Sequence, residues 1–195
     1  MKKLFIIGGM GAGKSTARKA LVDAGLPYID LDKVGHDVLA WDTVREELVD
    51  PFGADIMDGD EVNRKALAHK AFVSPAETRK LNRITVPRIE DAYRDKVAEL
   101  EAAGHPAVVV EHSVFKNRTS SLAYVVIAVL APLDVRIERA VASGFDEADV
   151  RRRIARQITD ADRIEAADVV FNNDGTPEEL HNQVIAWWGE YRKDL

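Results

Sequence analysis

The sequence predicts an α/β fold with three layers, in which a mainly parallel β-sheet lies between two layers of helices. Two observations support this prediction. Continuous apolar runs rich in valine at 107–110 and 123–130 are typical of strands covered on both faces in a parallel sheet. Helical patterns follow a third apolar run at 3–7 and separate the later runs, and this alternation implies right-handed crossovers between parallel strands.

The remaining elements are predicted from periodicity and from residues that begin or end helices. A helix at 14–24 follows the first strand and ends at Gly25, and a second strand at 26–29 stops at Asp30. The other expected elements are helices at 33–40, 44–103, 132–142 and 146–158, a last strand at 168–171, and a closing helix capped by Thr176. Within 44–103 we expect turns at Asp50–Pro51, Asp58–Gly59–Asp60, Ser74–Pro75 and Val86–Pro87.

The composition is that of an ordinary soluble globular protein. The chain of 195 residues is 46% hydrophobic and 31% charged, which fits one domain with a sizeable core. A net charge of -6 argues against a nucleic-acid partner, and the apolar runs are too short to cross a membrane. We therefore expect a cytoplasmic protein that acts on a small molecule, with an oligomeric state that composition leaves open. The absence of cysteine excludes disulfides and thiolate chemistry.

A glycine-rich loop follows the first strand directly. Gly8, Gly13, Lys14 and Ser15 satisfy the pattern G-x-x-x-x-G-K-[ST] between a predicted strand and a predicted helix. Glycines let the backbone curl so that its amides, together with the helix N-terminus, surround a polyphosphate. A purely structural glycine turn is the alternative. The residues expected to bind the nucleotide are Gly9, Gly11, Ala12, Gly13, Lys14, Ser15 and Thr16.

The loop predicts a P-loop fold and a nucleotide ligand, but it leaves the reaction open. Lys14 is expected to reach the terminal phosphates, and the Ser15 hydroxyl is expected to bind Mg²⁺. A motor, a switch, a kinase and a binding module all share this arrangement. The residues at the end of the next strand distinguish these four kinds of protein.

Two aspartates stand at that position. Asp30 and Asp32 follow the second strand, and the ends of neighbouring parallel strands converge on one edge of the sheet. A carboxylate there can accept the proton of an acceptor hydroxyl or hold a water of a bound magnesium ion. The alternative is structural, because Asp32 could cap the helix expected to begin at Lys33.

Further motifs resemble one enzyme family along nearly the whole chain. The segments GGMGAGKST, DLDKVGHDVL and AFVSP resemble those of dephospho-coenzyme A kinases. The other matching residues are Phe52, Gly53, Asn63, Arg64, Leu67, Leu81, Asn82, Gln157, Arg163, Ala167, Asp168, Asn173 and Gly175. The resemblance implies transfer of the terminal phosphate of ATP to the ribose 3'-hydroxyl of dephospho-coenzyme A. It also implies a single P-loop kinase-like domain over 1–195, with a nucleotide core (about 1–40, 105–140 and 165–195), a helical substrate region (41–104) and a lid (140–164).

The resemblance also assigns roles to individual residues. Asp32 matches the family's catalytic base, and Asp30 would support that base or the metal's water. Arg139 matches a catalytic position, and Arg152 lies in the lid, whose arginines neutralise the phosphoryl group in flight. Asn173 resembles a residue of the adenine-binding loop, although an ordinary turn into the closing helix fits the same sequence.

The chain departs from the family pattern in three places. The family's His-Pro pair is replaced by Val86–Pro87, and an arginine of the family is replaced by Asp160. The family's P-L-L-F-E stretch is replaced by residues 111–115, EHSVF. There Glu111 is either a substitute carboxylate that orients magnesium or an exposed residue at a strand end.

The arginines of the predicted lid have a structural alternative. The pairs Glu147–Arg151, Asp149–Arg153 and Arg156–Asp160 are spaced i,i+4, as on a solvated helix face, whereas Arg152 has no acid at that spacing. Three functions stay open at this stage: a dephospho-coenzyme A kinase that uses ATP and Mg²⁺, a kinase for another small acceptor such as a nucleoside monophosphate, and a nucleotide-binding protein without kinase activity.

Overall fold

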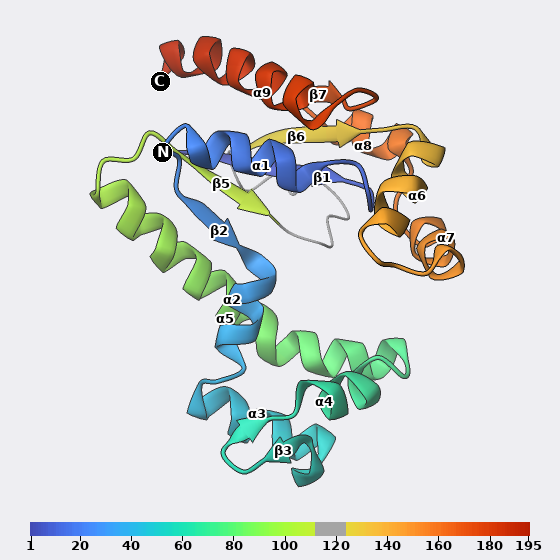
Figure 1. Ribbon diagram of the computed structural model, residues 1–195. Helices are drawn as coiled ribbons and strands as arrows, with labels where there is room; N and C mark the ends of the chain where they lie inside the picture. The colour runs from blue at the N-terminus through green and yellow to red at the C-terminus, as the bar shows by residue number, and fades with distance from the viewer. Residues whose placement is uncertain (112–123) are drawn as a thin grey trace. The chain divides into compact units, whose positions relative to one another are not determined.

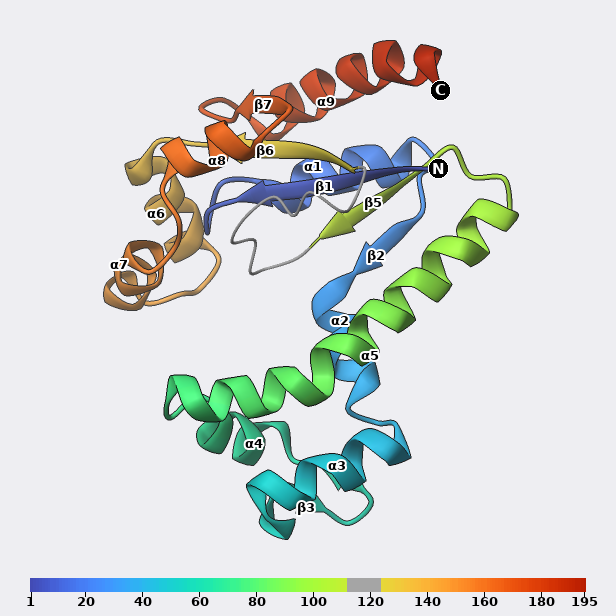
Figure 2. The ribbon, with the colours of Figure 1, turned by 180° about the vertical axis from the view of Figure 1, so that it is seen from behind.

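The computed structural model describes residues 1–111 and 124–195. The segment EHSVF, in which we expect the chain to depart from its family, therefore lies outside the described residues after Glu111. The chain forms two compact units, one made of residues 1–29 and 100–195 and the other of residues 30–99. Figure 1 and Figure 2 show the elements of both units from opposite sides.

The first unit is built on a five-stranded sheet with the order β2-β5-β1-β6-β7. Its strands are β1 (Lys2–Gly8), β2 (Tyr28–Asp30), β5 (Ala107–Glu111), β6 (Tyr124–Leu130) and β7 (Val169–Asn172). The pairs β1–β5, β1–β6 and β6–β7 are all parallel. Since β1 lies at the centre of the sheet, the loop that follows it opens in the middle of the sheet's carboxyl edge. The predicted α/β fold with a mainly parallel sheet is confirmed.

Helices cover both faces of this sheet. The helices of this unit are α1 (Lys14–Asp23), α6 (Leu133–Ala142), α7 (Glu147–Ala155), α8 (Asp160–Ala166), α9 (Pro177–Tyr191) and the short η2 (Arg192–Asp194). Helices α1 and α9 pack against each other, while α8 contacts β1 and β6. Figure 1 and Figure 2 show α1 on one face of the sheet and α8 on the other, which gives the three predicted layers.

The hydrophobic core beneath α1 and α9 consists of alternate strand residues, because successive side chains of a strand point to opposite faces. Leu4 and Ile6 of β1 are buried there beside Val109 of β5 and Leu21 of α1. Trp188 of α9 completes this cluster and is only 4% exposed. Burial of each such large apolar side chain contributes about 1.5–3 kcal/mol, so this core holds the strand before the glycine loop and the helix after it in place.

The second unit is mainly helical. Its elements are α2 (Leu31–Val38), α3 (Asp42–Phe52), η1 (Ala54–Ile56), β3 (Met57–Asp58), β4 (Glu61–Val62), α4 (Arg64–Ala71) and α5 (Pro75–Ala102). The last residues of α5, from Leu100 on, belong to the first unit. Val44, Leu48 and Ile56 are fully buried within it. The antiparallel hairpin β3–β4 turns at Gly59, where we expected a turn but no strands.

Two of the predicted turns are wrong. Pro51 and Pro87 lie inside α3 and α5 instead of ending helices. Proline removes one backbone donor, but a long helix retained by packing tolerates this loss and bends. Figure 1 shows α5 bent about midway, and Pro87 lies near the middle of its 28 residues.

The helix predicted at 146–158 is also interrupted. Helix α7 ends at Ala155, and α8 starts afresh at Asp160 with Thr159 as its N-cap. The Thr159 hydroxyl accepts a hydrogen bond from the Asp162 amide, and the Asp162 carboxylate accepts one from the Thr159 amide at 2.9 Å. This capping box specifies a helix start, which periodicity alone does not detect.

Asp30 caps helix α2. Its Oδ1 accepts hydrogen bonds from the amides of Asp32 at 2.9 Å and Lys33 at 3.0 Å, so the helix begins at Leu31, two residues earlier than predicted. The alternative that Asp32 is the cap is therefore wrong. Asp32 lies in the first turn instead and is half-buried.

Among the helices that the structure describes, none has both the length and the apolar character that crossing a bilayer requires.

Replacement of the cap residue Asp30 is expected to destabilise the protein more than replacement of Asp32. Asp30→Ala leaves two amides of α2 without their acceptor and should lower the free energy of unfolding by about 1 kcal/mol. Asp32→Asn keeps the cap and should cost less than half as much. Urea unfolding followed by circular dichroism measures both, and equal losses would contradict the cap assignment.

Candidate nucleotide-binding site

The loop between β1 and α1 is curled by two glycines in the left-handed region. Gly11 has φ = 74° and Gly13 has φ = 102°, a conformation that side chains other than glycine rarely adopt. Gly13 is also the N-cap of α1 and makes no side-chain capping bond. Since the first amides of a helix lack partners within the helix, this N-terminus presents its donors to a ligand.

Neighbouring atoms leave no space for side chains on these glycines. A Cβ atom added to Gly9 would lie 1.9 Å from Nη2 of Arg136, and one added to Gly11 would lie 2.2 Å from the Arg136 carbonyl oxygen. A Cβ atom on Gly13 would lie 2.1 Å from Nδ2 of Asn173. The loop therefore needs glycine for close packing as well as for its backbone angles.

A cavity of about 330 Å³ opens over this loop. Of the residues predicted to bind nucleotide in the loop, all but Ala12 line it, and Ala12 is buried behind it. The lining residues are Gly9, Met10, Gly11, Gly13, Lys14, Ser15, Thr16, Glu111, Arg139, Ala140, Ser143 and Phe145. The structure thus brings the predicted Mg²⁺ ligands Ser15 and Glu111 to one cavity with Lys14.

Lys14 is folded onto the loop. Its Nζ donates to the carbonyl oxygens of Gly8 at 3.0 Å and Gly9 at 3.3 Å. Burial lowers the pKa of Lys14 below its ordinary value; the carboxylate of Glu111 opposes this effect, and the guanidinium groups of Arg163 and Arg136 add to it. Among the carboxylates that the structure describes, Glu111 favours the ammonium group of Lys14 but forms no ion pair with it, so a polyphosphate in the cavity would supply a counterion.

Glu111 is held at the end of β5 by two side chains of the same unit. Its Oε2 accepts a hydrogen bond from the Tyr28 hydroxyl at 3.1 Å and lies 3.6 Å from Nε of Arg18. The Arg18 guanidinium in turn lies over the Tyr28 ring, 4.6 Å from its centroid. Because Glu111 is half-buried and lines the cavity, the alternative of an exposed strand-end residue does not fit the structure.

Asn173 and Arg139 connect the segment after β7 to the loop. Asn173 is 5% exposed, and its Nδ2 donates to the Ala12 carbonyl at 2.8 Å. Arg139 donates to the carbonyl oxygens of Asn173 at 3.0 Å and Gly175 at 2.8 Å, so its guanidinium holds this segment as well as lining the cavity. Sequence reasoning gave Arg139 a catalytic role only, and that role stays a prediction.

A second cavity, of about 590 Å³, adjoins this segment. Its lining includes Asn172, Asn173, Gly175 and Thr176. The predicted position of the adenine-binding loop therefore borders an open space large enough for part of a nucleotide.

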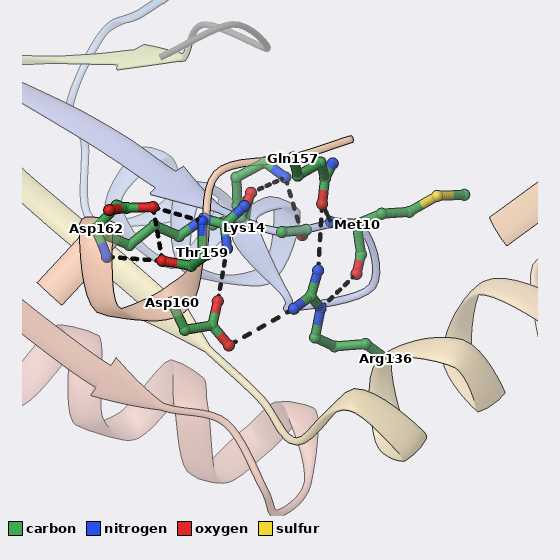
Figure 3. A network of polar contacts seen from close by, with 10 residues as sticks. Met10, Lys14, Arg136, Gln157, Thr159, Asp160 and Asp162 are labelled. Atoms are coloured by element: carbon green, nitrogen blue, oxygen red, sulfur yellow. Dashed lines mark hydrogen bonds and ion pairs between the residues drawn. The ribbon is translucent and has the colours of Figure 1, made fainter. Parts of the chain in front are cut away.

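A network of polar contacts joins the loop to α6 and to the start of α8 (Figure 3). Arg136 of α6 is 4% exposed, and its Nε donates to the Met10 carbonyl at 2.9 Å. Asp160 accepts from Arg163 at 2.6 Å and lies 3.6 Å from Nη1 of Arg136. Sequence reasoning missed Arg136; the available signal is its place four residues before Ala140, on the face of α6 that is buried.

The exposed arginines of α7 pair locally. Arg151 lies 2.8 Å from Glu147 and Arg153 lies 2.6 Å from Asp149, as the i,i+4 spacing predicted. Arg152 has no acid at i,i+4, as the sequence indicated, but it lies 3.3 Å from Asp149 at i,i+3. The predicted pair of Arg156 with Asp160 is also wrong, because α7 ends before Arg156 and Asp160 contacts Arg136 and Arg163 instead.

The second unit has a cavity of its own, of about 230 Å³. Its lining is mostly apolar and comes from α2, α4 and α5: Gly35, His36, Leu39, Arg64, Leu67, Ala68, Phe72, Leu81, Thr85 and Ile89. The predicted base Asp32 lies in the first turn of the same helix α2. Arg64, Leu67 and Leu81 belong to the motifs that carry the family resemblance.

Among residues 1–111 and 124–195, no group of three or more histidine, aspartate or glutamate side chains is arranged to hold a metal ion. A magnesium ion that arrives with a nucleotide needs no such cage, because phosphate oxygens and waters supply most of its ligands. The Ser15 hydroxyl and the Glu111 carboxylate in one cavity are donors of the kind that Mg²⁺ prefers.

The central strand of the parallel sheet leads into a curled glycine loop, and a partly buried lysine then begins a helix without a side-chain cap. This arrangement defines a P-loop nucleotide-binding protein. Comparison with known proteins narrows the class to kinases. The family model of dephospho-CoA kinase matches residues 4–179, and the chain belongs to this family.

Individual relatives agree with the family match. A dephospho-CoA kinase of Corynebacterium efficiens is 41% identical over 190 residues, which cover 94% of each chain. The crystal structure of a Thermus thermophilus protein is similar with a TM-score of 0.81 and 27% identity, covering 97% of each chain. A dephospho-CoA kinase from Campylobacter jejuni has the same fold, with a TM-score of 0.67, 20% identity and coverage of 97% of this chain and 96% of that one.

The lowered pKa of Lys14 predicts that ADP binding depends on pH below the range in which an ordinary lysine titrates. A bound polyphosphate favours the ammonium form and raises the pKa of Lys14 again. Between the pKa of the free protein and that of the complex, binding takes up a proton, so affinity for ADP falls as pH rises through this range. Calorimetry in two buffers of different ionisation enthalpy measures this uptake.

The matched control is Lys19, an exposed lysine of α1 that pairs with Asp23 at 2.5 Å. Lys19→Met should keep the proton uptake, whereas Lys14→Met should abolish it together with most of the affinity. Uptake that persists in Lys14→Met would assign the titration to another group.

Proposed function

We propose that this protein transfers the terminal phosphoryl group of ATP to the ribose 3'-hydroxyl of dephospho-coenzyme A, giving coenzyme A and ADP. The main support is the family match over residues 4–179, which includes both the glycine loop and the helical unit. The cavity over the loop, with Lys14 in its wall, supports the nucleotide half of the reaction.

The nucleotide is held by its phosphates at the N-terminus of α1. Amides of the curled loop donate to the phosphate oxygens, and Nζ of Lys14 leaves the carbonyl oxygens of Gly8 and Gly9 to bind the terminal phosphates. The adenine lies beside the segment at Asn173, where the second cavity opens. Asn173 also braces the loop from behind through Ala12.

Ser15 and Glu111, which line the same cavity, would hold magnesium. When bound, it neutralises charge on the transferring phosphate. The Tyr28 and Arg18 contacts orient the Glu111 carboxylate toward this role. Asp30 is the third predicted contributor. Because its Oδ1 accepts two backbone amides, it would act through its other oxygen on a water of the metal.

Asp32 is the general base. Its carboxylate takes the proton of the ribose 3'-hydroxyl as that oxygen attacks the terminal phosphorus, and ADP leaves in line with the attack. Arg139 and the lid residue Arg152 stabilise the negative charge of the phosphoryl group during transfer. Arg152 is exposed and its pair with Asp149 lies at the surface, so it can turn toward a bound nucleotide at little cost.

The helical region at 41–104 binds the acceptor. The cavity enclosed by α2, α4 and α5 has a mainly apolar lining, which suits an uncharged part of the acceptor. A net charge of -6 favours a small-molecule acceptor over a nucleic acid.

One observation favours a second candidate, a kinase for another small acceptor or a relative that binds nucleotide without transfer. The replaced motifs at Val86–Pro87 and at 111–115 belong to the acceptor side of the family pattern. Release of ADP, measured with a panel of acceptors, separates the candidates. Turnover with dephospho-coenzyme A alone supports the main proposal, and turnover only with a nucleoside monophosphate or another alcohol would overturn it.

Asp32→Asn is expected to lower kcat by about 10²–10⁴ while the affinity for ADP stays unchanged, because the amide cannot accept the proton. Asp37→Asn is the matched control on the same helix: Asp37 is exposed and pairs with Lys33 at 2.9 Å. Steady-state kinetics and calorimetry measure the two quantities. Equal kcat values for the two variants would remove Asp32 from the base role.

A further inference from the structure

Arg136 is a buried arginine that touches the phosphate loop from behind. It lies on α6, its side chain is 5% exposed, and it reaches residues 126 positions away in sequence. Its Nε donates to the Met10 carbonyl at 2.9 Å, and its Nη2 donates to Oε1 of Gln157 at 3.2 Å. One planar group thus contacts both the loop and the connection between α7 and α8.

Gln157 closes this arrangement into a ring. The same Oε1 atom accepts a hydrogen bond from the Met10 amide at 3.0 Å. Both polar groups of Met10 are therefore held, the carbonyl by Arg136 directly and the amide through Gln157 (Figure 3). Met10 lies between Gly9 and Gly11, so these bonds act on the residue around which the loop curls.

Charge balance explains how a guanidinium persists at this position. Burial lowers the pKa of Arg136, the carboxylate of Asp160 opposes this, and the guanidinium of Arg163 adds to it. Asp160 lies 3.6 Å from Arg136 and 2.6 Å from Arg163, and it is thereby shared between two buried cations. An arginine stays protonated under these conditions, so its donors remain fixed in direction.

We propose that Arg136 is a positioning residue for nucleotide binding, which holds the Met10 peptide with Gln157 and so keeps the loop in its phosphate-binding curve. This inference rests on the proposed function insofar as the ligand of the loop is a nucleoside polyphosphate. Arg136 acts through the loop backbone, because its Nε and Nη2 donate to Met10 and Gln157 while its Nη1 faces Asp160.

The geometry distinguishes this role from a general effect of positive charge. An arginine presents several donors in a rigid plane, whereas a lysine is a single flexible point charge. Arg136→Lys keeps the charge near the phosphates but cannot bond Met10 and Gln157 in the same way. If Arg136 acts only through its charge, Arg136→Lys should keep the affinity for ADP. If Arg136 acts by positioning the loop, Arg136→Lys should lose affinity.

The test measures ADP affinity by calorimetry in four variants of the full chain, with thermal melts to verify folding. Arg136→Lys should weaken ADP binding about tenfold or more, and Gln157→Ala should weaken it several-fold. The double variant should be no weaker than Arg136→Lys alone, because both changes release the same peptide. Arg151→Lys is the control, since Arg151 is exposed and pairs with Glu147 on α7.

Unchanged affinity in Arg136→Lys, or losses that multiply in the double variant, would overturn the inference. If Arg136→Lys does not fold, Gln157→Ala decides alone, because the Gln157 residue is exposed and its loss leaves the core intact. In that variant, ADP affinity equal to the unaltered protein would overturn the inference. Failure of the unaltered protein to bind ADP would overturn both proposals, whereas ADP binding without transfer to dephospho-coenzyme A would overturn the proposed function alone.

Discussion

The structure depends on a close approach between the glycines of the phosphate loop and two buried polar residues, which meet Gly9 and Gly13 with side-chain atoms and Gly11 with the Arg136 backbone. Arg136 occupies the space beside Gly9 and Gly11, and Asn173 occupies the space beside Gly13. These contacts force the loop to curl and hold it against α6 and the end of β7. Because β1 is the central strand and pairs with β5 over Lys2–Ile6 and with β6 over Lys3–Gly8, the curled loop has a rigid base. A ligand site on such a base is preorganised, so less ordering is needed when phosphate binds.

The same contacts concentrate positive charge. Lys14, Arg136 and Arg163 influence one another, and Glu111 and Asp160 are the acids that oppose them. Glu111 is itself engaged by Arg18 and Tyr28, so the cluster retains an excess of positive charge at the loop. A nucleoside polyphosphate supplies the missing negative charge, which connects the packing of the loop to the ligand class.

The sequence predicted the features that depend on neighbours along the chain. The loop, the strand before it and the helix after it follow from a contiguous pattern, and the cap of α9 at Thr176 follows from local residue types. Helix α2 was predicted to begin at Lys33 instead of Leu31, with Asp32 as a possible cap, because aspartate is a good cap at either position. The contacts of Arg136 with Met10 and of Asn173 with Ala12 span 126 and 161 positions, and no local signal pairs them. Periodicity alone predicts a helix that continues to 158, and the predicted pair of Arg156 with Asp160 assumed helical spacing. The capping box at Thr159 instead starts a new helix, so this pair does not form.

The most direct measurement compares the affinity for ATP of two variants, Gly13→Ala and Gly25→Ala. Both glycines have positive φ, 102° and 93°, so both changes strain the backbone. A Cβ atom on Gly13 meets Asn173 at 2.1 Å, whereas one on Gly25 has open space around it. The account predicts that Gly13→Ala loses ATP binding in calorimetry while Gly25→Ala keeps it. Equal affinity in the two folded variants would contradict the claim that the packed curl of this loop forms the nucleotide site.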